Sequence, residues 1–155
     1  MSGNKHTYEK AKAWMDTICE YAKALDPKTW ERLEELDSLK KTNQSEKKEL
    51  RALMALERKY WDEGHAREMA QEAALSVELS GTWAAGETPK ANGFVILLTT
   101  GGPALRIVGE LNQYQEPSRA WLEYQDWDIP WTEYHGDNSD MAALLTFCSC
   151  FYFGE

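Results

Sequence analysis

The residues best suited to acid–base chemistry are five carboxylates in the second half of the chain, Glu110, Glu123, Asp126, Asp128 and Glu133. Glycosidases use such a pair, in which one carboxyl donates a proton and the other acts as a base or nucleophile. Three of these carboxylates also flank tryptophans, an arrangement typical of sugar sites. One hypothesis is therefore a small hydrolase that uses this acidic, aromatic loop.

The other patterns that could carry chemistry are incomplete. TTGGP (99–103) lacks the spacing of a phosphate loop or a dinucleotide loop and precedes a strand-like segment, so it indicates a hairpin turn. The three histidines have no second histidine at i+3 or i+4, and Cys148-x-Cys150 is not a zinc spacing. No Gly-x-Ser-x-Gly motif is present. We expect neither a metal nor a nucleotide cofactor.

The stretch LEYQDWDIPWTEYHGD (122–137) also fits a docking surface, because it holds two tryptophans, two tyrosines, five acidic residues and no lysine or arginine. Tryptophan and tyrosine anchor protein interfaces, and carboxylates around them suit a basic target. The alternative is that Trp127, Trp131 or both fill the gap between a sheet and the last helix. The residues predicted to contact a partner are Asp126, Trp127, Asp128, Trp131, Glu133, Tyr134 and Asp137.

The net charge of −9 is unevenly distributed along the chain. Residues 1–75 are almost balanced, whereas residues 76–155 hold only Lys90, Arg106 and Arg119 against eleven acidic residues. This field repels phosphates and favours basic partners, so we expect no direct nucleic-acid binding by the C-terminal half. Solubility alone is the other explanation of the acidity.

The first 75 residues show helical periodicity. Apolar residues recur at helical spacing over 8–25, and Asp26–Pro27 should end that helix and cap the next one, whose stripe covers 30–39. A third stripe covers 50–61, with Ser45 as its expected cap and Gly64 as its expected end. A shorter helix should cover about 65–74, which gives a helical region over 1–75.

The second half changes to strand-like patterns. LSVELSGTW (75–83) alternates as a half-exposed strand does, and FVILLTT (94–100) predicts a central strand covered on both faces. Residues 94–126 should form three consecutive antiparallel strands. In the last hairpin, Leu111 facing Ser118 would place Glu110 opposite Arg119, and Arg106 would then face Glu123.

The chain should end in a buried helix. Pro130 restricts Ile129 to extended geometry, so 125–137 is expected to be a connection and not a helix. Asp137 or Ser139 can cap an apolar helix from about Asp140. The prediction is an α+β fold with N-terminal helices, a four-stranded antiparallel meander and a C-terminal helix packed on the sheet. Residues 76–155 are assigned to the sheet domain, in one compact unit with the helical region.

The segment ILLTTGGPALRIVGELNQYQEPSRAWLEYQDWDIPWTEY (96–134) resembles a motif of small proteins encoded by phages, plasmids and integrated elements of bacteria. The resemblance covers roughly 75–155 and implies an anti-CRISPR or antirestriction role, with no residue role carried over.

The leading hypothesis is a non-enzymatic inhibitor that binds a bacterial defence nuclease or CRISPR effector and blocks access of nucleic acid. The alternatives are the hydrolase and an oligomeric adaptor of a mobile element that assembles through its N-terminal helices. A cytoplasmic location in the bacterial host is expected, because the three cysteines fit a reducing compartment and no secretory h-region or membrane-length apolar run is visible.

Overall fold

The structure of the protein is a computed structural model that describes residues 2–81, 84–88, 90–101 and 103–153, with the side chains of residues 2–4 excepted. Four helices come first: α1 (Ser2–Ala24), α2 (Pro27–Asp37), α3 (Gln44–Tyr60) and α4 (Glu63–Ala73). The strands are β1 (Ser76–Ser80), β2 (Gly93–Thr99), β3 (Ala104–Leu111), β4 (Pro117–Asp126) and β5 (Ile129–Glu133). They are followed by α5 (Asn138–Cys148).

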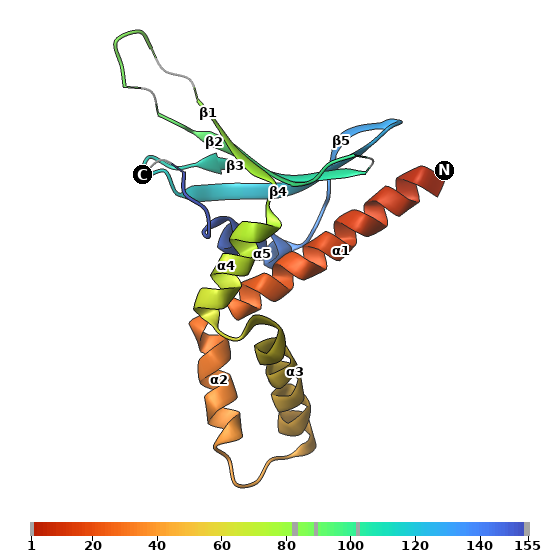
Figure 1. Ribbon diagram of the computed structural model, residues 1–155, viewed down its shortest axis with the longest axis vertical. Coiled ribbons are helices and arrows are strands. Elements are labelled where there is room, and N and C mark those ends of the chain that lie inside the picture. Colours follow the sequence, from red (N-terminus) through yellow and green to blue (C-terminus); the bar gives the residue numbers. More distant parts are fainter. Residues whose placement is uncertain (1, 82–83, 89, 102, 154–155) are drawn as a thin grey trace.

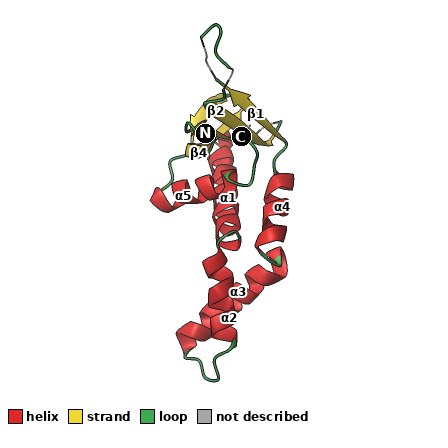
Figure 2. Ribbon diagram, turned by 90° about the vertical axis from the view of Figure 1, so that its left-hand side faces the viewer, coloured by secondary structure: helices red, strands yellow, loops and turns green. Residues whose placement is uncertain are grey.

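The strands form one antiparallel sheet in the order β1-β2-β3-β4-β5. Helices α1, α4 and α5 lie on one side of this sheet, and α2 and α3 form a hairpin that projects away from it (Figures 1 and 2). We call the sheet side that faces the helices the inner face and the opposite side the outer face. The expected α+β architecture is confirmed. Within the described part of the chain, no helix is long and apolar enough to cross a membrane.

The core lies between the inner face, α1 and α5. Phe94, Ile96 and Leu98 of β2 are buried there, together with Ile107 of β3 and Leu122 of β4. Helix α1 contributes the buried side chains of its predicted stripe, and α5 contributes another set. The buried apolar side chains from α1 and α5 are Ala11, Met15, Ile18, Tyr21, Ala24, Ala143, Leu144, Phe147 and Cys148.

Strand β2 is covered on one face only, so the expectation of a strand covered on both faces was wrong. Phe94, Ile96 and Leu98 are buried, but the alternate residues, such as Val95 and Leu97, are only half-buried on the outer face. An antiparallel sheet can leave one face to solvent, and a continuous apolar run therefore does not require a second covering layer.

Strand β1 is more exposed than the half-exposed strand that its alternation predicted. Val77 and Leu79 pair with the buried Ile96 and Phe94, which places them on the inner face, yet their side chains are 37% and 46% exposed. All five residues of β1 are exposed, because the layer of helices does not extend over this edge of the sheet.

The predicted register of the β3–β4 hairpin is confirmed over most of its length. Glu110 lies opposite Arg119, and Arg106 lies opposite Glu123. No helix occurs among the described residues between 94 and 125. Leu111, however, pairs with Pro117 and not with Ser118, because the register shifts after Glu110.

The strand count of four was wrong, because residues 129–133 pair with β4 as a fifth strand. Pro130 has no N–H to donate, and proline in a sheet is confined to edge strands and bulges. Strand β5 lies at the sheet edge, with a register shift between Tyr124 and Asp126 of β4. Extended geometry at Ile129 therefore continues into an edge strand instead of an irregular connection.

The cap of helix α3 lies two residues before Ser45, the expected cap, and the helix begins at Gln44. Asn43 caps it, because the Asn43 side chain accepts a hydrogen bond from the Glu46 backbone N–H while the Glu46 carboxylate accepts one from the Asn43 N–H. This reciprocal pair satisfies two backbone donors, an arrangement that a cap at Ser45 would lose.

The end of α3 also differs from the prediction, because Gly64 lies inside α4 instead of ending α3. Helix α3 ends at Tyr60, and Trp61 follows with φ 66° and ψ −63°. The Asp62 N–H donates to the Tyr60 carbonyl at 2.8 Å, which closes a γ-turn around Trp61. Asp62 then caps α4 by accepting a hydrogen bond from the His65 N–H.

Candidate partner-binding surface

The seven residues predicted to contact a partner belong to three different local structures. Residues 126–128 are at the hairpin turn between β4 and β5, residues 131 and 133 lie on β5, and residues 134–137 connect β5 to α5. The side chains of these three groups make different contacts.

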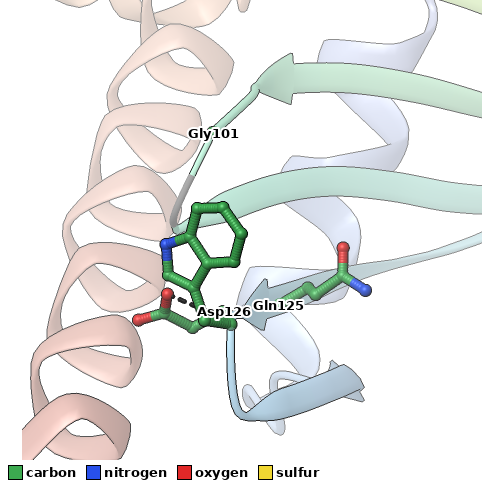
Figure 3. Close-up of a pocket in the computed structure, with 4 residues that line it drawn as sticks. Gly101, Gln125 and Asp126 are labelled. Carbon is green, nitrogen blue, oxygen red and sulfur yellow. Dashed lines mark hydrogen bonds between the residues drawn. The ribbon is translucent and has the colours of Figure 1, made fainter.

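Trp127 is the most exposed large apolar side chain among the described residues, at 87% of its surface. It does not fill a gap between the sheet and α5, so that alternative is wrong for this residue. Together with Gly101, Gln125 and Asp126, it lines a hollow of about 300 Å³ (Figure 3). The β2–β3 turn and the β4–β5 turn therefore meet at one end of the sheet.

Asp126 is engaged within the chain. Its carboxylate accepts hydrogen bonds from the Trp127 N–H and from Thr7 Oγ1, both at 2.8 Å, so it fastens the hairpin tip to α1. The Trp127 N–H and then the Thr7 hydroxyl hold the pKa of Asp126 below its usual value, with smaller contributions from the charges of His6 and Lys10. No local pattern predicts the contact with Thr7, which lies 119 residues away.

Trp131 lies on the outer face and not between the sheet and α5. The Arg106 guanidinium stacks over the Trp131 ring, 3.9 Å from its centre. Arg106 also pairs with Glu123, whose Oε1 accepts from Nη2 at 2.6 Å and from Nε at 2.8 Å. Trp121 Nε1 donates to the second oxygen of Glu123 at 2.9 Å. One guanidinium and one carboxylate thus connect two tryptophans on the outer face.

Arg119 makes a similar but looser arrangement on the same sheet. Its guanidinium lies 5.0 Å from the centre of the Trp121 ring and 3.7 Å from the Glu110 carboxylate. Both arginines of the sheet are therefore neutralised by carboxylates, as the predicted register required. The predicted register already places Trp121 on the same face as Arg119 and Glu123, but the stacking of the two guanidinium groups on indole rings was not predicted.

Asp128 and Glu133 are exposed and differ from Asp126 in their contacts. Among the described residues, the structure gives neither side chain a hydrogen bond or ion pair. We use the name β5 surface for Trp127, Asp128, Trp131 and Glu133. This surface combines two indoles, one of them already in contact with a guanidinium, with two carboxylates that have no partner in the described chain.

Tyr134 and Asp137 have contacts that stabilise the fold. The Tyr134 ring packs against Tyr8 of α1 with ring centres 5.4 Å apart, and burial is the main cause that raises its pKa to about 12. Asp137 caps α5 by accepting from the Asp140 N–H at 2.9 Å, and it accepts from Ser139 Oγ at 2.7 Å. The Ser139 hydroxyl and the Asp140 N–H lower the pKa of Asp137.

A smaller hollow of about 150 Å³ lies beside β5, and Glu133, Tyr134, His135 and Asp140 are among its lining residues. Asp140 also accepts a hydrogen bond from the Cys19 thiol at 3.3 Å. Burial first, and then Asp140, raise the pKa of Cys19 to about 11. Because the thiolate is the reactive form of cysteine, this thiol is protonated and unreactive at neutral pH.

The other two cysteines, Cys148 and Cys150, are buried, and burial raises the pKa of each. No group of three or more His, Cys, Asp or Glu side chains among the described residues is arranged to hold a metal ion. Comparisons of the chain with protein-family models, with curated proteins and with solved structures found no match.

Proposed function

We propose that this protein is a non-enzymatic binding protein that docks on a basic surface of another protein through its β5 surface. The observation that carries the proposal is the 87% exposure of Trp127 beside the carboxylate of Asp128, which has no hydrogen bond or ion pair among the described residues. Tryptophan is highly buried on average in folded proteins, and it is the residue most enriched at interface positions that dominate binding energy.

The geometry of the β5 surface suits lysine or arginine side chains of a partner. A cation that enters the hollow and lies over the face of the Trp127 indole would make a cation–π contact, which contributes about 0.5–2 kcal/mol, depending on desolvation. Asp128 and Glu133 would add attraction during encounter. Arg106 and Arg119 do not oppose such a partner, because Glu123 and Glu110 already neutralise them.

We propose a bacterial defence nuclease or CRISPR effector as the class of target. Two features support this choice: the acidic C-terminal half and the resemblance of residues 96–134 to small proteins of phages and mobile elements. Such a nuclease has a basic channel for nucleic acid, and an acidic protein that occupies the channel blocks it without chemistry. The site of action would be the cytoplasm of the bacterial host.

The test is to incubate the protein with purified CRISPR effector complexes and measure cleavage of target DNA. We expect inhibition by the wild-type protein and its loss in the variants Trp127→Ala and Asp128→Lys/Glu133→Lys. The matched control is Glu68→Lys/Glu72→Lys on α4, which changes the net charge equally at exposed positions. Inhibition that the β5 variants leave intact would place the interface elsewhere. Absence of both binding and inhibition across a panel of effectors would refute the proposed target class.

A further inference from the structure

A second acidic and aromatic hollow lies on the projecting hairpin. It measures about 280 Å³ and is formed by α2, α3 and the turn before α4. We call it the hairpin groove. It is lined by two tryptophans, two aliphatic side chains and four carboxylates, and none of its lining residues is basic. The lining residues are Trp30, Leu33, Glu34, Asp37, Met54, Glu57, Trp61 and Asp62.

The groove residues follow from helical periodicity. On α2 they stand at positions i, i+3, i+4 and i+7 from Trp30, and on α3 Met54 and Glu57 are three apart. Residues at these spacings share one face of a helix. The face of α2 that carries Leu33 therefore packs against α3 along the groove. The carboxylates lie at the margin of the groove.

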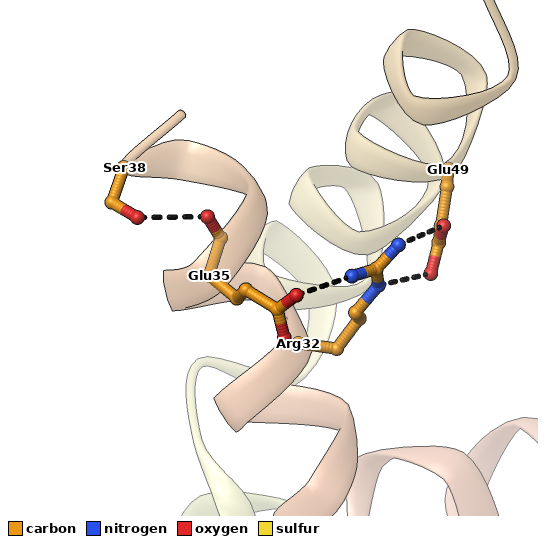
Figure 4. Close-up of polar contacts among 4 residues, drawn as sticks. All are labelled: Arg32, Glu35, Ser38 and Glu49. Carbon is orange, nitrogen blue, oxygen red and sulfur yellow. Dashed lines mark hydrogen bonds and ion pairs between the residues drawn. The ribbon is translucent and has the colours of Figure 1, made fainter. Parts of the chain in front are cut away.

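Two carboxylates elsewhere on the same hairpin, Glu35 and Glu49, are paired with an arginine, whereas three of the groove are not. Outside the groove, Arg32 pairs with Glu35 at 2.8 Å and with Glu49 at 2.9 Å, which joins α2 to α3 (Figure 4). Among the described residues, in contrast, the structure gives no hydrogen bond or ion pair to the side chains of Glu34, Asp37 and Glu57. Arg32, which bridges the two helices, lies outside the groove, and no basic residue is among the lining residues that the structure describes.

Trp61 is held at the groove by the γ-turn that separates α3 from α4. Its side chain is 65% exposed and stacks on His65, with ring centres 4.0 Å apart and planes 11° apart. A bulky residue at positive φ is a genuine outlier in proteins. Burial of this indole in the core does not account for its conformation, because most of the ring remains in water.

We propose that the hairpin groove binds a basic segment of a protein partner, in which a lysine or arginine lies next to an apolar residue. The apolar residue and the aliphatic stem of the basic residue would contact Met54 and the two indoles, while the cationic end would reach Glu34, Asp37 or Glu57. The volume of about 280 Å³ is at the lower limit of sites that enclose drug-sized ligands, and it suits one or two side chains of a larger partner. This site is separate from the β5 surface and does not depend on the function proposed for it.

The test uses two synthetic amphipathic peptides with identical leucine positions, one carrying lysine and arginine at its polar positions and the other glutamate. Calorimetry with the full chain should detect binding of the basic peptide only. Glu34→Lys/Glu57→Lys should weaken that binding at least tenfold. Glu31→Lys/Glu68→Lys changes the net charge equally at exposed helical positions outside the groove, and it should alter the affinity less than twofold. Trp127→Ala should leave the affinity unchanged.

Several outcomes would overturn the inference. They are equal binding of the acidic peptide, no binding of the basic peptide at millimolar concentration, and equal weakening by the two charge variants. Self-association that Glu34→Lys/Glu57→Lys abolishes would show that a second copy of the chain occupies the groove, again against the proposal. If the lysine variant fails to fold, Glu34→Gln/Glu57→Gln is used in its place, with the indole N–H resonances of Trp30 and Trp61 as the measure of binding.

Discussion

Trp61 adopts a backbone conformation that costs free energy, and its side chain recovers little of it through burial. A positive φ at a non-glycine residue in a sparsely populated region costs about 1–3 kcal/mol. The 65% exposure of the side chain limits the apolar surface that could offset this cost. Strain of this kind persists only where the surrounding structure imposes it, here the hydrogen-bonded γ-turn between α3 and α4.

The strain at Trp61 predicts an unusual order of stability among variants. Trp61→Gly removes both the indole and the penalty for positive φ, whereas Trp61→Ala removes only the indole. We expect the glycine variant to be more stable than the alanine variant by about 1 kcal/mol. Chemical denaturation gives the two free energies of unfolding. An alanine variant that is equally or more stable would contradict the assigned backbone conformation.

Asp126 predicts a pH dependence of stability. Its pKa is lowered in the folded protein by the Trp127 N–H and by Thr7, so folding favours the ionised form. This contribution is present in full above the unfolded pKa of about 3.9 and is lost as the pH falls through the lower folded value.

The matched comparison for Asp126 is with Asp126→Asn. The difference in melting temperature between the wild-type protein and this variant should be largest at pH 6 and should shrink as the pH falls toward 2. A difference that stays constant over this range would show that the hydrogen bonds of Asp126 contribute no stability through its charge.

At the scale of elements, periodicity and cross-strand pairing predicted most of the architecture. The β3–β4 register followed from two opposite-charge pairs and the alternation of apolar residues. Strand β5 could not be predicted in this way, because it is only five residues long and contains Pro130. Whether such a segment pairs depends on whether a neighbouring strand has a free edge, and the local sequence does not contain this information.

The same limit applies to the candidate site. The composition of residues 122–137 correctly drew attention to an exposed tryptophan at position 127. It could not separate Trp127 from Trp131, because the guanidinium over Trp131 belongs to Arg106 on β3. Nor could it separate Asp128 from Asp126, because the second partner of Asp126 is on α1. Contacts with residues of distant segments determine which of these acidic side chains have a hydrogen bond or ion pair within the described chain.

The role of Asp137 belongs to helix α5. Asp137→Ala removes the capping interactions at its N-terminus and should destabilise the protein by about 1 kcal/mol, whereas Ser139→Ala should have a smaller effect. Thermal and chemical unfolding measure both. If Asp137 contacted a partner instead of serving mainly as a cap, Asp137→Ala would leave stability unchanged and weaken partner binding.

In the whole molecule, two surfaces built by different elements combine exposed tryptophans with acidic side chains that have no hydrogen bond or ion pair among the described residues. The β5 surface lies on the β4–β5 turn and on the edge strand β5, and the hairpin groove lies on helices that project from the sheet (Figure 1). The two surfaces share no lining residues, and substitutions at distant sites without common partners have additive effects on free energy. Variants of one surface are therefore suitable controls for the other.

The net charge of −9 predicts how binding to a basic partner responds to salt. Electrostatic attraction between separated surfaces acts mainly on the association rate, and at 0.1 M ionic strength it is screened over about 10 Å. For the wild-type protein, we expect the association rate with the proposed nuclease partner to fall steeply between about 50 and 500 mM salt. Asp128→Lys/Glu133→Lys should associate more slowly at low salt and show a shallower dependence.

Surface-binding kinetics at four salt concentrations would measure this response. Glu68→Lys/Glu72→Lys is the decisive control, because it carries the same net charge as the β5 variant. If the acidity of the chain served only solubility, both variants would change the association rate equally, since only the total charge would matter. A larger effect of the β5 variant would instead show that attraction is focused at Asp128 and Glu133, as a docking surface requires.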